Sequence, residues 1–113
     1  MPSVKFKLAV LVSGRGSNLQ AIIDSIEKHN LAADISLILS NVPDAYALQR
    51  GKKHGLESIF LDPKSFSSRD DYEKQMIKLL QTKSIDLVCL AGFMRILGKK
   101  FIEAFSGKII NIH

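Results

Sequence analysis

The sequence predicts an α/β fold with three layers, in which a parallel sheet lies between two layers of helices. Two patterns carry this prediction: short apolar runs alternate along the chain with segments whose apolar residues recur at helical spacing. A third observation is the glycine-rich stretch Ser13–Ser17, which stands directly between the first apolar run and the first helical segment. This is the layout of a strand, a phosphate-binding loop and a helix N-terminus, as in Rossmann-like sheets. The 113 residues fit one domain.

The first part of the sequence contains three predicted strands and two predicted helices. Lys7–Val12 is almost wholly apolar, as a strand that is buried on both faces should be. Ser17 or Asn18 can cap the helix that follows, and apolar residues recur on one face of that helix from Leu19 onward until it ends near Lys28–Asn30. The next elements are a strand at Ile35–Leu39, a helix at Ala45–His54 that Gly55 ends, and a strand at Glu57–Leu61.

The rest of the sequence repeats this alternation. Asp62–Ser68 is a predicted loop, and Ser68 or Asp70 can start a third helix, which keeps helical spacing from Tyr72 to Leu80. Right-handed crossovers would place the carboxyl ends of all the strands at one edge of the sheet, where ligands bind near the point at which the strand order reverses. The remaining predicted elements are a strand at Asp86–Leu90, a loop at Ala91–Leu97, a brief helix at Lys99–Phe105 that Gly107 ends, and a strand at Lys108–Ile112.

The composition favours a solvated surface over a nucleic-acid partner. The net charge is +5, from 16 basic and 11 acidic residues, but the basic residues are scattered along the chain. No apolar run approaches the roughly 20 residues that span a bilayer, and the N-terminus lacks the apolar core and cleavage site of a signal peptide. The one cysteine, Cys89, lies in an apolar run and is expected to be a buried thiol. We therefore expect a cytoplasmic protein that binds neither nucleic acid nor membranes.

The glycine-rich stretch predicts an anion site of a particular kind. Gly14 and Gly16 allow a tight turn with positive φ and a close approach of a ligand to the backbone. A dinucleotide site would need a third glycine where Leu19 stands and an acidic residue after the second strand, and a P-loop would need a lysine. A mononucleotide-like or sugar-phosphate site remains, with donors from Gly16, Ser17 and Asn18. The alternative is a tight turn that only caps the helix.

The last three residues form a second candidate site. Asn111 and His113 are two positions apart on a predicted strand, so their side chains point to the same face. An amide beside an imidazole suits acyl transfer, because the amide can hold a developing oxyanion while the imidazole moves a proton. The other two histidines, His29 and His54, stand at predicted helix ends and are expected to be solvated.

Two arginines complete the candidates. Arg69 follows a loop at the expected ligand edge, and Arg95 lies in another such loop. Either guanidinium could bind a carboxylate through two parallel hydrogen bonds, although both residues also fit an ordinary surface role. No cluster of cysteine and histidine has metal-ligand spacing, so we expect no metal.

Three motifs, taken together, resemble one enzyme family: Ser13–Ile22, Ala91–Leu97 and Asn111–His113. In this order they resemble the phosphoribosylglycinamide formyltransferases, the folate-dependent transformylases of purine synthesis. The resemblance covers the chain from Lys7 onward. The first two motifs are specific, whereas the Asn-x-His motif is shared with other folate formyltransferases, including those that act on methionyl-tRNA and those that hydrolyse formyl-folate.

The resemblance implies a role for each matched position. The amine of glycinamide ribonucleotide would attack the formyl carbon of 10-formyltetrahydrofolate, the co-substrate, and no metal is implied. Asn111 would polarise the formyl oxygen, while His113 would stabilise the tetrahedral oxyanion and deliver a proton to the leaving nitrogen. The implied binding residues are Gly16, Ser17 and Asn18 for the phosphate, and Arg69, Met94, Arg95, Ile96, Leu97 and Asn111 for the folate.

The resemblance also implies that residues 1–113 are the N-terminal part of a single formyltransferase domain. The family continues past the Asn-x-His motif into Pro-Ser-Leu-Leu-Pro, and later supplies an aspartate that pairs with the histidine, further strands and much of the folate pocket. We therefore expect this portion to be inactive alone, with its fifth strand as an exposed edge. Two alternatives stay open: another folate-dependent formyltransferase or formyl-folate hydrolase, and a non-catalytic α/β module that binds a phosphate or nucleotide. The oligomeric state is not fixed, and a homodimer stays open.

Overall fold

Helices and strands alternate along the chain in the computed structural model, which describes residues 6–112. Every strand and helix expected from the sequence is present, with ends that differ from the expectation by a few residues. The elements are β1 (Phe6–Val12), α1 (Ser17–Glu27), β2 (Ala33–Ser40), α2 (Tyr46–Lys53), β3 (Ser58–Phe60), a 3-10 turn (Pro63–Ser65), α3 (Arg69–Thr82), β4 (Leu87–Ala91), α4 (Lys99–Ala104) and β5 (Ile109–Ile112).

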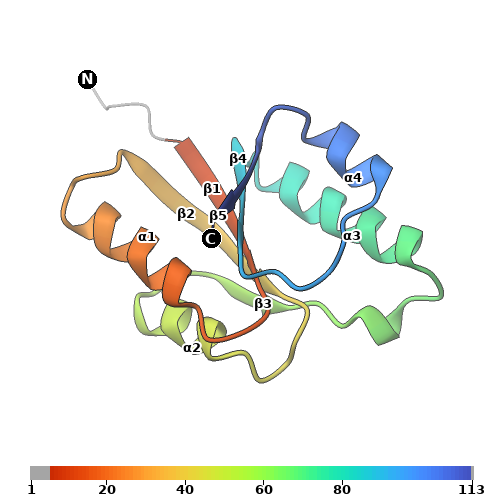
Figure 1. The fold of residues 1–113 in the computed structure, drawn as a ribbon, viewed down its shortest axis with the longest axis horizontal. Coiled ribbons are helices and arrows are strands. Elements are labelled where there is room, and N and C mark those ends of the chain that lie inside the picture. The colour runs from red at the N-terminus through yellow and green to blue at the C-terminus, as the bar shows by residue number, and fades with distance from the viewer. Residues whose placement is uncertain (1–5, 113) are drawn as a thin grey trace.

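The five strands form one parallel sheet in the order β3-β2-β1-β4-β5. Helices α1 and α2 cover one face of this sheet, and α3 and α4 cover the other (Figure 1). The expected three-layer α/β/α arrangement is thus confirmed. The strand order reverses between β1 and β4, so the loops that follow these two strands flank the point where ligands bind in such sheets.

Strand β1 reads as a continuous apolar run because it lies in the middle of the sheet. Every residue of Leu8–Val12 is buried. Val10 and Val12 pack in the core against α1 and α2, while Ala9 and Leu11 pack in the core against α3 and α4. Successive side chains of a strand point to opposite faces, so both cores need apolar residues from the same short segment.

Two local expectations around α3 have different outcomes. Ser68 caps this helix as expected, because its hydroxyl accepts a hydrogen bond from the Asp71 amide at 3.1 Å. The segment Asp62–Ser68, expected to be a plain loop, contains the 3-10 turn. The amide of Lys64 in this turn donates a hydrogen bond to the Asp62 carboxylate at 2.9 Å. An aspartate before a proline therefore starts a short helix here rather than a loop.

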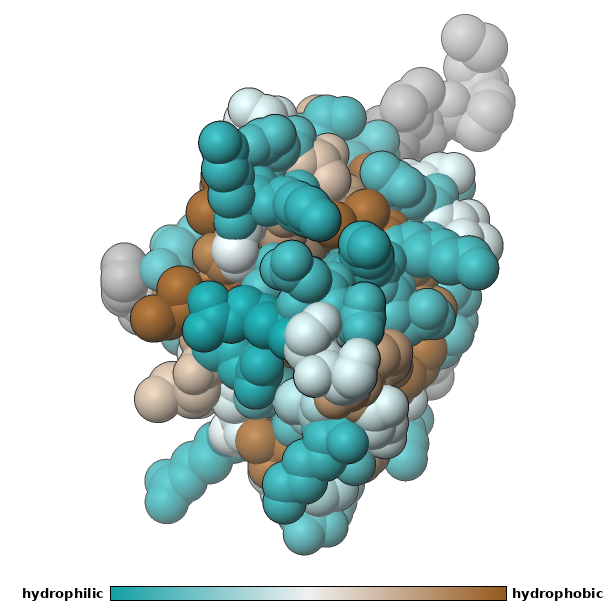
Figure 2. Space-filling model, turned by 90° about the vertical axis from the view of Figure 1, so that its right-hand side faces the viewer, coloured by the Kyte–Doolittle hydropathy of each residue, from teal (hydrophilic) through white to brown (hydrophobic). Residues whose placement is uncertain are grey.

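The face of the molecule over α3 and α4 carries mostly polar side chains (Figure 2). Figure 2 shows the side of the molecule that lies on the right in Figure 1, where α3 and α4 are, and most of its surface is hydrophilic. Four lysines of these helices are exposed: Lys74, Lys78, Lys99 and Lys100. Between residues 6 and 112, no helix is both long and apolar enough to cross a membrane.

Candidate functional site

Ser13 joins three loops at the carboxyl-end edge of the sheet. It follows β1 directly and is 8% exposed. Its hydroxyl donates a hydrogen bond to Asn41 Oδ1 (2.5 Å), which lies after β2, and accepts one from the amide of Met94 (2.8 Å), which lies after β4. The glycine-rich turn and the loop after β4 are therefore held side by side at the point where the strand order reverses.

The glycine-rich turn points its carbonyl groups into the protein. The Gly14 carbonyl accepts from the Ala47 amide (3.1 Å), the Arg15 carbonyl from Arg50 Nε (2.7 Å), and the Gly16 carbonyl from the Gln20 amide (2.8 Å). In a trans peptide the N–H points opposite to the C=O, so the amides that follow these carbonyls point away from the protein. Within the described chain, the amides of residues 15–17 donate to no protein acceptor.

Gly16 is the residue that makes this turn feasible. Its φ is 82°, in the left-handed region, and it stands immediately before α1 as the N-cap. A Cβ added to Gly16 would lie 2.6 Å from the Cβ of Ala47 and 2.8 Å from its Cα, so α2 packs directly on the bare backbone. The expectation of a positive φ is correct for Gly16 and wrong for Gly14, which needs no left-handed backbone but leaves open space around its Cα.

The expectation that Ser17 or Asn18 caps α1 is wrong. Gly16 occupies the N-cap position, and no side chain accepts a hydrogen bond from the first turn. Ser17 is already inside the helix, where its hydroxyl is exposed. The side-chain amide of Asn18 instead donates to the carbonyl of Ile112 (3.3 Å), which ties the start of α1 to the end of β5. The backbone amides at the start of α1, which is the positive end of the helix dipole, are thus free to bind an acceptor other than a capping side chain.

The loop after β4 forms a second feature, on the other side of the reversal point. Met94, Arg95 and Ile96 line a pocket together with Arg69 at the start of α3. Met94 and Ile96 are 82% and 81% exposed, so this pocket presents apolar surface to the solvent. Leu97 is not part of this lining, because its side chain packs against the core on the α3 and α4 side.

Helix α3 supports this loop through two buried residues. The guanidinium of Arg95 lies over the ring of Tyr72, 5.0 Å from its centroid, and the Tyr72 hydroxyl donates to the Leu61 carbonyl at 2.9 Å. Burial raises the pKa of Tyr72 to about 12, although the positive charge of Arg95 acts in the opposite direction. Glu73, 4% exposed, accepts from the Gly98 amide with both carboxylate oxygens, at 2.9 and 3.0 Å.

Sequence reasoning missed Glu73, although a signal was present. The residue lies next to Tyr72 on a helix whose buried positions include Met76 and Leu80, so it stands on the core stripe with an ionisable side chain. A carboxylate at such a position is retained only where a donor reaches it. Here the donor is the last amide of the loop after β4, and Glu73 therefore fixes the end of that loop.

Asn111 is exposed at the end of β5. Ile109, two positions earlier, packs in the core on the α3 and α4 side, so Asn111 shares that face of the strand. Helix α3 covers the same face of the sheet (Figure 1). Arg69, at the start of α3, lines a pocket with the loop after β4. His113 lies outside the described residues.

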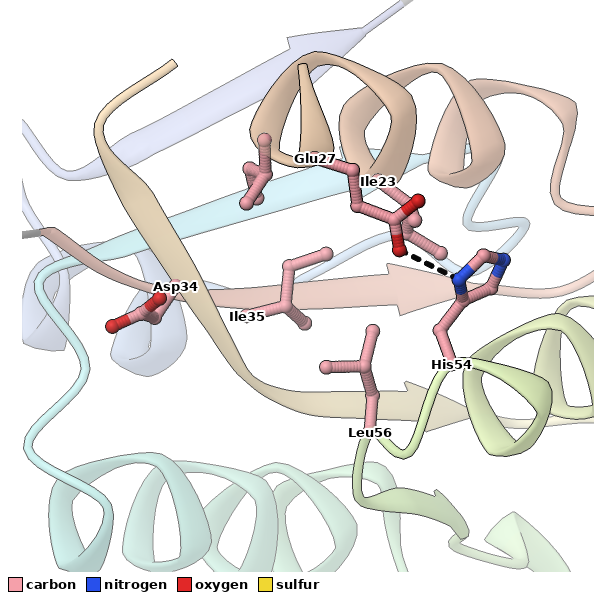
Figure 3. Close-up of a pocket in the computed structure, with 7 residues that line it drawn as sticks. Ile23, Glu27, Asp34, Ile35, His54 and Leu56 are labelled. Atoms are coloured by element: carbon pink, nitrogen blue, oxygen red, sulfur yellow. Dashed lines mark hydrogen bonds and ion pairs between the residues drawn. The ribbon is translucent and has the colours of Figure 1, made fainter. Parts of the chain in front are cut away.

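A further pocket lies at the opposite edge of the sheet, away from the residues singled out above. Figure 3 shows that the ring of His54, at the end of α2, points toward Glu27 on α1, with 2.7 Å between Nδ1 and Oε2. The side chains of Ile23, Ile35 and Leu56 line the same pocket. The His54 ring is therefore hydrogen-bonded to a side chain of the neighbouring helix, and the expectation that it is merely solvated is wrong.

Cys89 is 4% exposed in the core between β4 and α1, and burial raises the pKa of its thiol. The expectation of a buried cysteine is confirmed. In the stretch from Phe6 to Ile112, no three His, Cys, Asp or Glu side chains gather in a way that could hold a metal ion.

The amino-acid sequence of this chain is similar to those of known formyltransferases. A family model described as formyl transferase matches residues 6–113. The phosphoribosylglycinamide formyltransferase of Haemophilus influenzae is 42% identical over 107 residues, which are 95% of this chain and 50% of the relative, and that of Escherichia coli is 39% identical over 106 residues, with 94% and 50% covered. This chain therefore spans about half the length of these bacterial relatives.

Solved structures show the same likeness in the fold. The phosphoribosylglycinamide formyltransferase of Coxiella burnetii superposes with a TM-score of 0.93 at 42% identity, over 97% of this chain and 52% of that one. The glycinamide ribonucleotide transformylase 1 of Symbiobacterium toebii superposes with a TM-score of 0.93 at 36% identity, over 96% of this chain and 51% of that one. The five-stranded sheet and its helices therefore have the same arrangement as about half of each of these solved proteins.

Proposed function

The chain belongs to the formyl transferase family, and we propose that it carries part of the active site that transfers a formyl group from 10-formyltetrahydrofolate to the amine of 5′-phosphoribosylglycinamide, a step of purine synthesis. One observation carries this proposal: three outward-pointing amides and a pocket of arginine and apolar side chains lie beside one another at the reversal point of the sheet. The names of the bacterial relatives and of the similar structures support the same substrates.

The glycine-rich turn is the proposed phosphate site of the acceptor. The outward amides of residues 15–17 stand at the positive end of the α1 dipole, and both features favour an anion. Gly16 and Ser17 would donate from their backbones, and the exposed Ser17 hydroxyl adds a further donor. Asn18 completes the site and, through the Ile112 carbonyl, links it to the strand that carries Asn111.

The pocket beside α3 is the proposed folate site. Met94 and Ile96 offer exposed apolar surface for the flat pterin ring, and Arg69 and Arg95 offer charge for the carboxylates of the folate. Leu97 would contribute through its backbone, since its side chain is packed in the core. Asn111 would reach the formyl group from β5.

The proposed chemistry is a direct acyl transfer. The glycinamide nitrogen forms a bond to the formyl carbon, and the bond from that carbon to the folate nitrogen breaks. Asn111 donates to the formyl oxygen while negative charge develops on it. His113 stabilises the tetrahedral intermediate and delivers to the folate nitrogen a proton that replaces the one the amine loses. These residues use no metal in the proposed reaction.

We also propose that residues 1–113 form the N-terminal part of a single domain, whose C-terminal half supplies the partner of His113 and the rest of the folate pocket. About half of each bacterial relative lies outside the match, which supports this division. Strand β5 pairs only with β4 among the described strands, so it offers a free edge for further strands. The proposed partners are the two small-molecule substrates, in the cytoplasm, without nucleic acid or membrane, and a homodimer remains compatible with these assignments.

The molecule that receives the formyl group distinguishes the proposed function from its alternatives. The complete domain, meaning this chain with its proposed C-terminal half, is expected to consume 10-formyltetrahydrofolate only when glycinamide ribonucleotide is added. The consumption is measured in parallel with methionyl-tRNA and with water alone. Equal consumption without an amine would indicate a hydrolase, a preference for methionyl-tRNA would indicate another transferase, and phosphate binding without consumption would indicate a non-catalytic module. Transfer by residues 1–113 alone would contradict the proposed division of the domain.

A further inference from the structure

Arg50 of α2 holds the middle carbonyl of the glycine-rich turn. Its Nε donates to the Arg15 carbonyl at 2.7 Å, and one of its terminal nitrogens donates to Gln20 Oε1 at 3.2 Å. Its guanidinium also lies over the ring of Tyr46, with 4.7 Å from Cζ to the ring centroid. The planar group is therefore fixed by a hydrogen bond to the turn, a hydrogen bond to α1 and an aromatic face.

This contact sets the direction of one amide. Because the Arg15 carbonyl points toward Arg50, the N–H of Gly16 in the same peptide points the opposite way, toward the open side of the turn. The neighbouring carbonyls accept from the backbone amides of Ala47 and Gln20, which are present whatever side chain stands there, proline excepted. Arg50 is thus the side chain on which the orientation of the turn depends.

The peptide between Arg15 and Gly16 needs such a restraint. Rotating this peptide plane changes the φ of the residue that follows it, and glycine tolerates φ values of either sign. A rotated peptide would turn its carbonyl oxygen, instead of its N–H, toward a bound anion, which would repel the anion. The glycine that allows the close packing on Ala47 also makes the turn easy to invert.

We propose that Arg50 is a positioning residue for phosphate recognition, which locks the Gly16 N–H toward the phosphate of the acceptor. The proposal rests on the proposed function for the identity of that anion. Arg50 contacts the Arg15 carbonyl on the inner side of the turn, so Arg50 acts by orienting this peptide and not as a direct phosphate ligand.

The test uses the complete domain with ribose 5-phosphate as the probe. Arg50→Met and Arg50→Lys are each expected to weaken binding of this probe by about tenfold, the effect of losing one well-aligned hydrogen bond to a charged group. Lysine keeps the charge but cannot reach both acceptors while it stacks on Tyr46. The matched control is Lys53→Met, which removes one positive charge from an exposed position of the same helix and should leave the affinity unchanged within twofold.

Two readouts separate positioning from a general loss of structure. The affinity for folic acid should stay within twofold of the parent in both Arg50 variants, and the Gly16 amide signal, which moves when ribose 5-phosphate binds to the parent, should no longer move. Unchanged binding of ribose 5-phosphate by both variants would overturn the inference. An Arg50→Lys variant that bound ribose 5-phosphate as tightly as the parent would also overturn it, and so would an equal loss of affinity for folic acid. If the parent itself fails to bind ribose 5-phosphate, the proposed function fails as well, so the two failures are distinguishable.

Discussion

Gly16→Ala is expected to lower the free energy of unfolding by about 2–5 kcal/mol and to remove the binding of ribose 5-phosphate. Two costs add: a left-handed backbone at an alanine costs about 1–2 kcal/mol, and forcing a methyl group into packed structure costs about 1–3 kcal/mol. The new Cβ would meet the Cβ and Cα of Ala47 at 2.6 and 2.8 Å, and a helix backbone cannot move aside as a flexible side chain can. Any relief pushes the turn away from α2 and misdirects its amides.

Denaturant unfolding of the complete domain measures the stability part of this prediction. Gly14→Ala is the matched control, since no atom lies within 4 Å of an added Cβ and no left-handed φ is involved. Its unfolding free energy should change by less than about 1 kcal/mol, as for an ordinary exposed substitution. If the two alanine variants were equally stable, the packing of α2 on the turn would not be what fixes Gly16.

Asn111→Ala is expected to reduce kcat of the complete domain by about 10²–10³-fold, the usual effect of removing one donor from an oxyanion site. Because the interaction is strongest when charge develops on the formyl oxygen, the KM for each substrate should change far less. Steady-state kinetics with both substrates varied separates the two quantities. Asn30→Ala, at an exposed position after α1, serves as the control for removing an asparagine.

A result in which Asn111→Ala raised only the KM for the folate, with kcat intact, would contradict the proposed role. Such a result would indicate that Asn111 binds the folate co-substrate equally well before and during the reaction. Its place at the end of β5, on the face of the strand that also bears Ile109, is compatible with binding but by itself does not stabilise a transition state.

Much of the fold follows from the sequence because burial on both faces of a central strand leaves a plain pattern. The run from Leu8 to Val12 is apolar at every position, since alternate side chains enter different cores. The same alternation predicts the glycine-rich turn, because Gly14 and Gly16 stand directly between a buried strand and a helix. The reversal of strand order between β1 and β4 then brings this turn beside the loop after β4.

The errors concern contacts between elements that are far apart in the sequence. Residue preference predicts Ser17 or Asn18 as the cap of α1, but the close approach of α2 requires a glycine at the cap position. The partner of Asn18 is 94 positions away along the chain, at the end of β5. Local propensity contains no information on which helix will pack on a turn, so these partners could not be predicted from periodicity.

The same limit applies to the residues that support the two proposed binding sites. Arg50 looks like an ordinary polar residue of an amphipathic helix, and Glu73 differs from its neighbours only in being charged on a buried stripe. Their roles follow from the carbonyl of Arg15 and the amide of Gly98, both backbone groups. Backbone groups are present at every residue, so the sequence gives no sign of which of them needs a partner.

The most direct test of two separate substrate sites is an amide NMR titration of the complete domain with each ligand alone. We expect ribose 5-phosphate to move the signals of Gly16 and Ser17 and to leave those of Met94–Leu97 unchanged, and we expect folic acid to do the reverse. Such a result would separate the two substrates to the two sides of the reversal point, as the formyl transfer requires. Both ligands moving the same set of signals, or ribose 5-phosphate moving only the loop after β4, would contradict it.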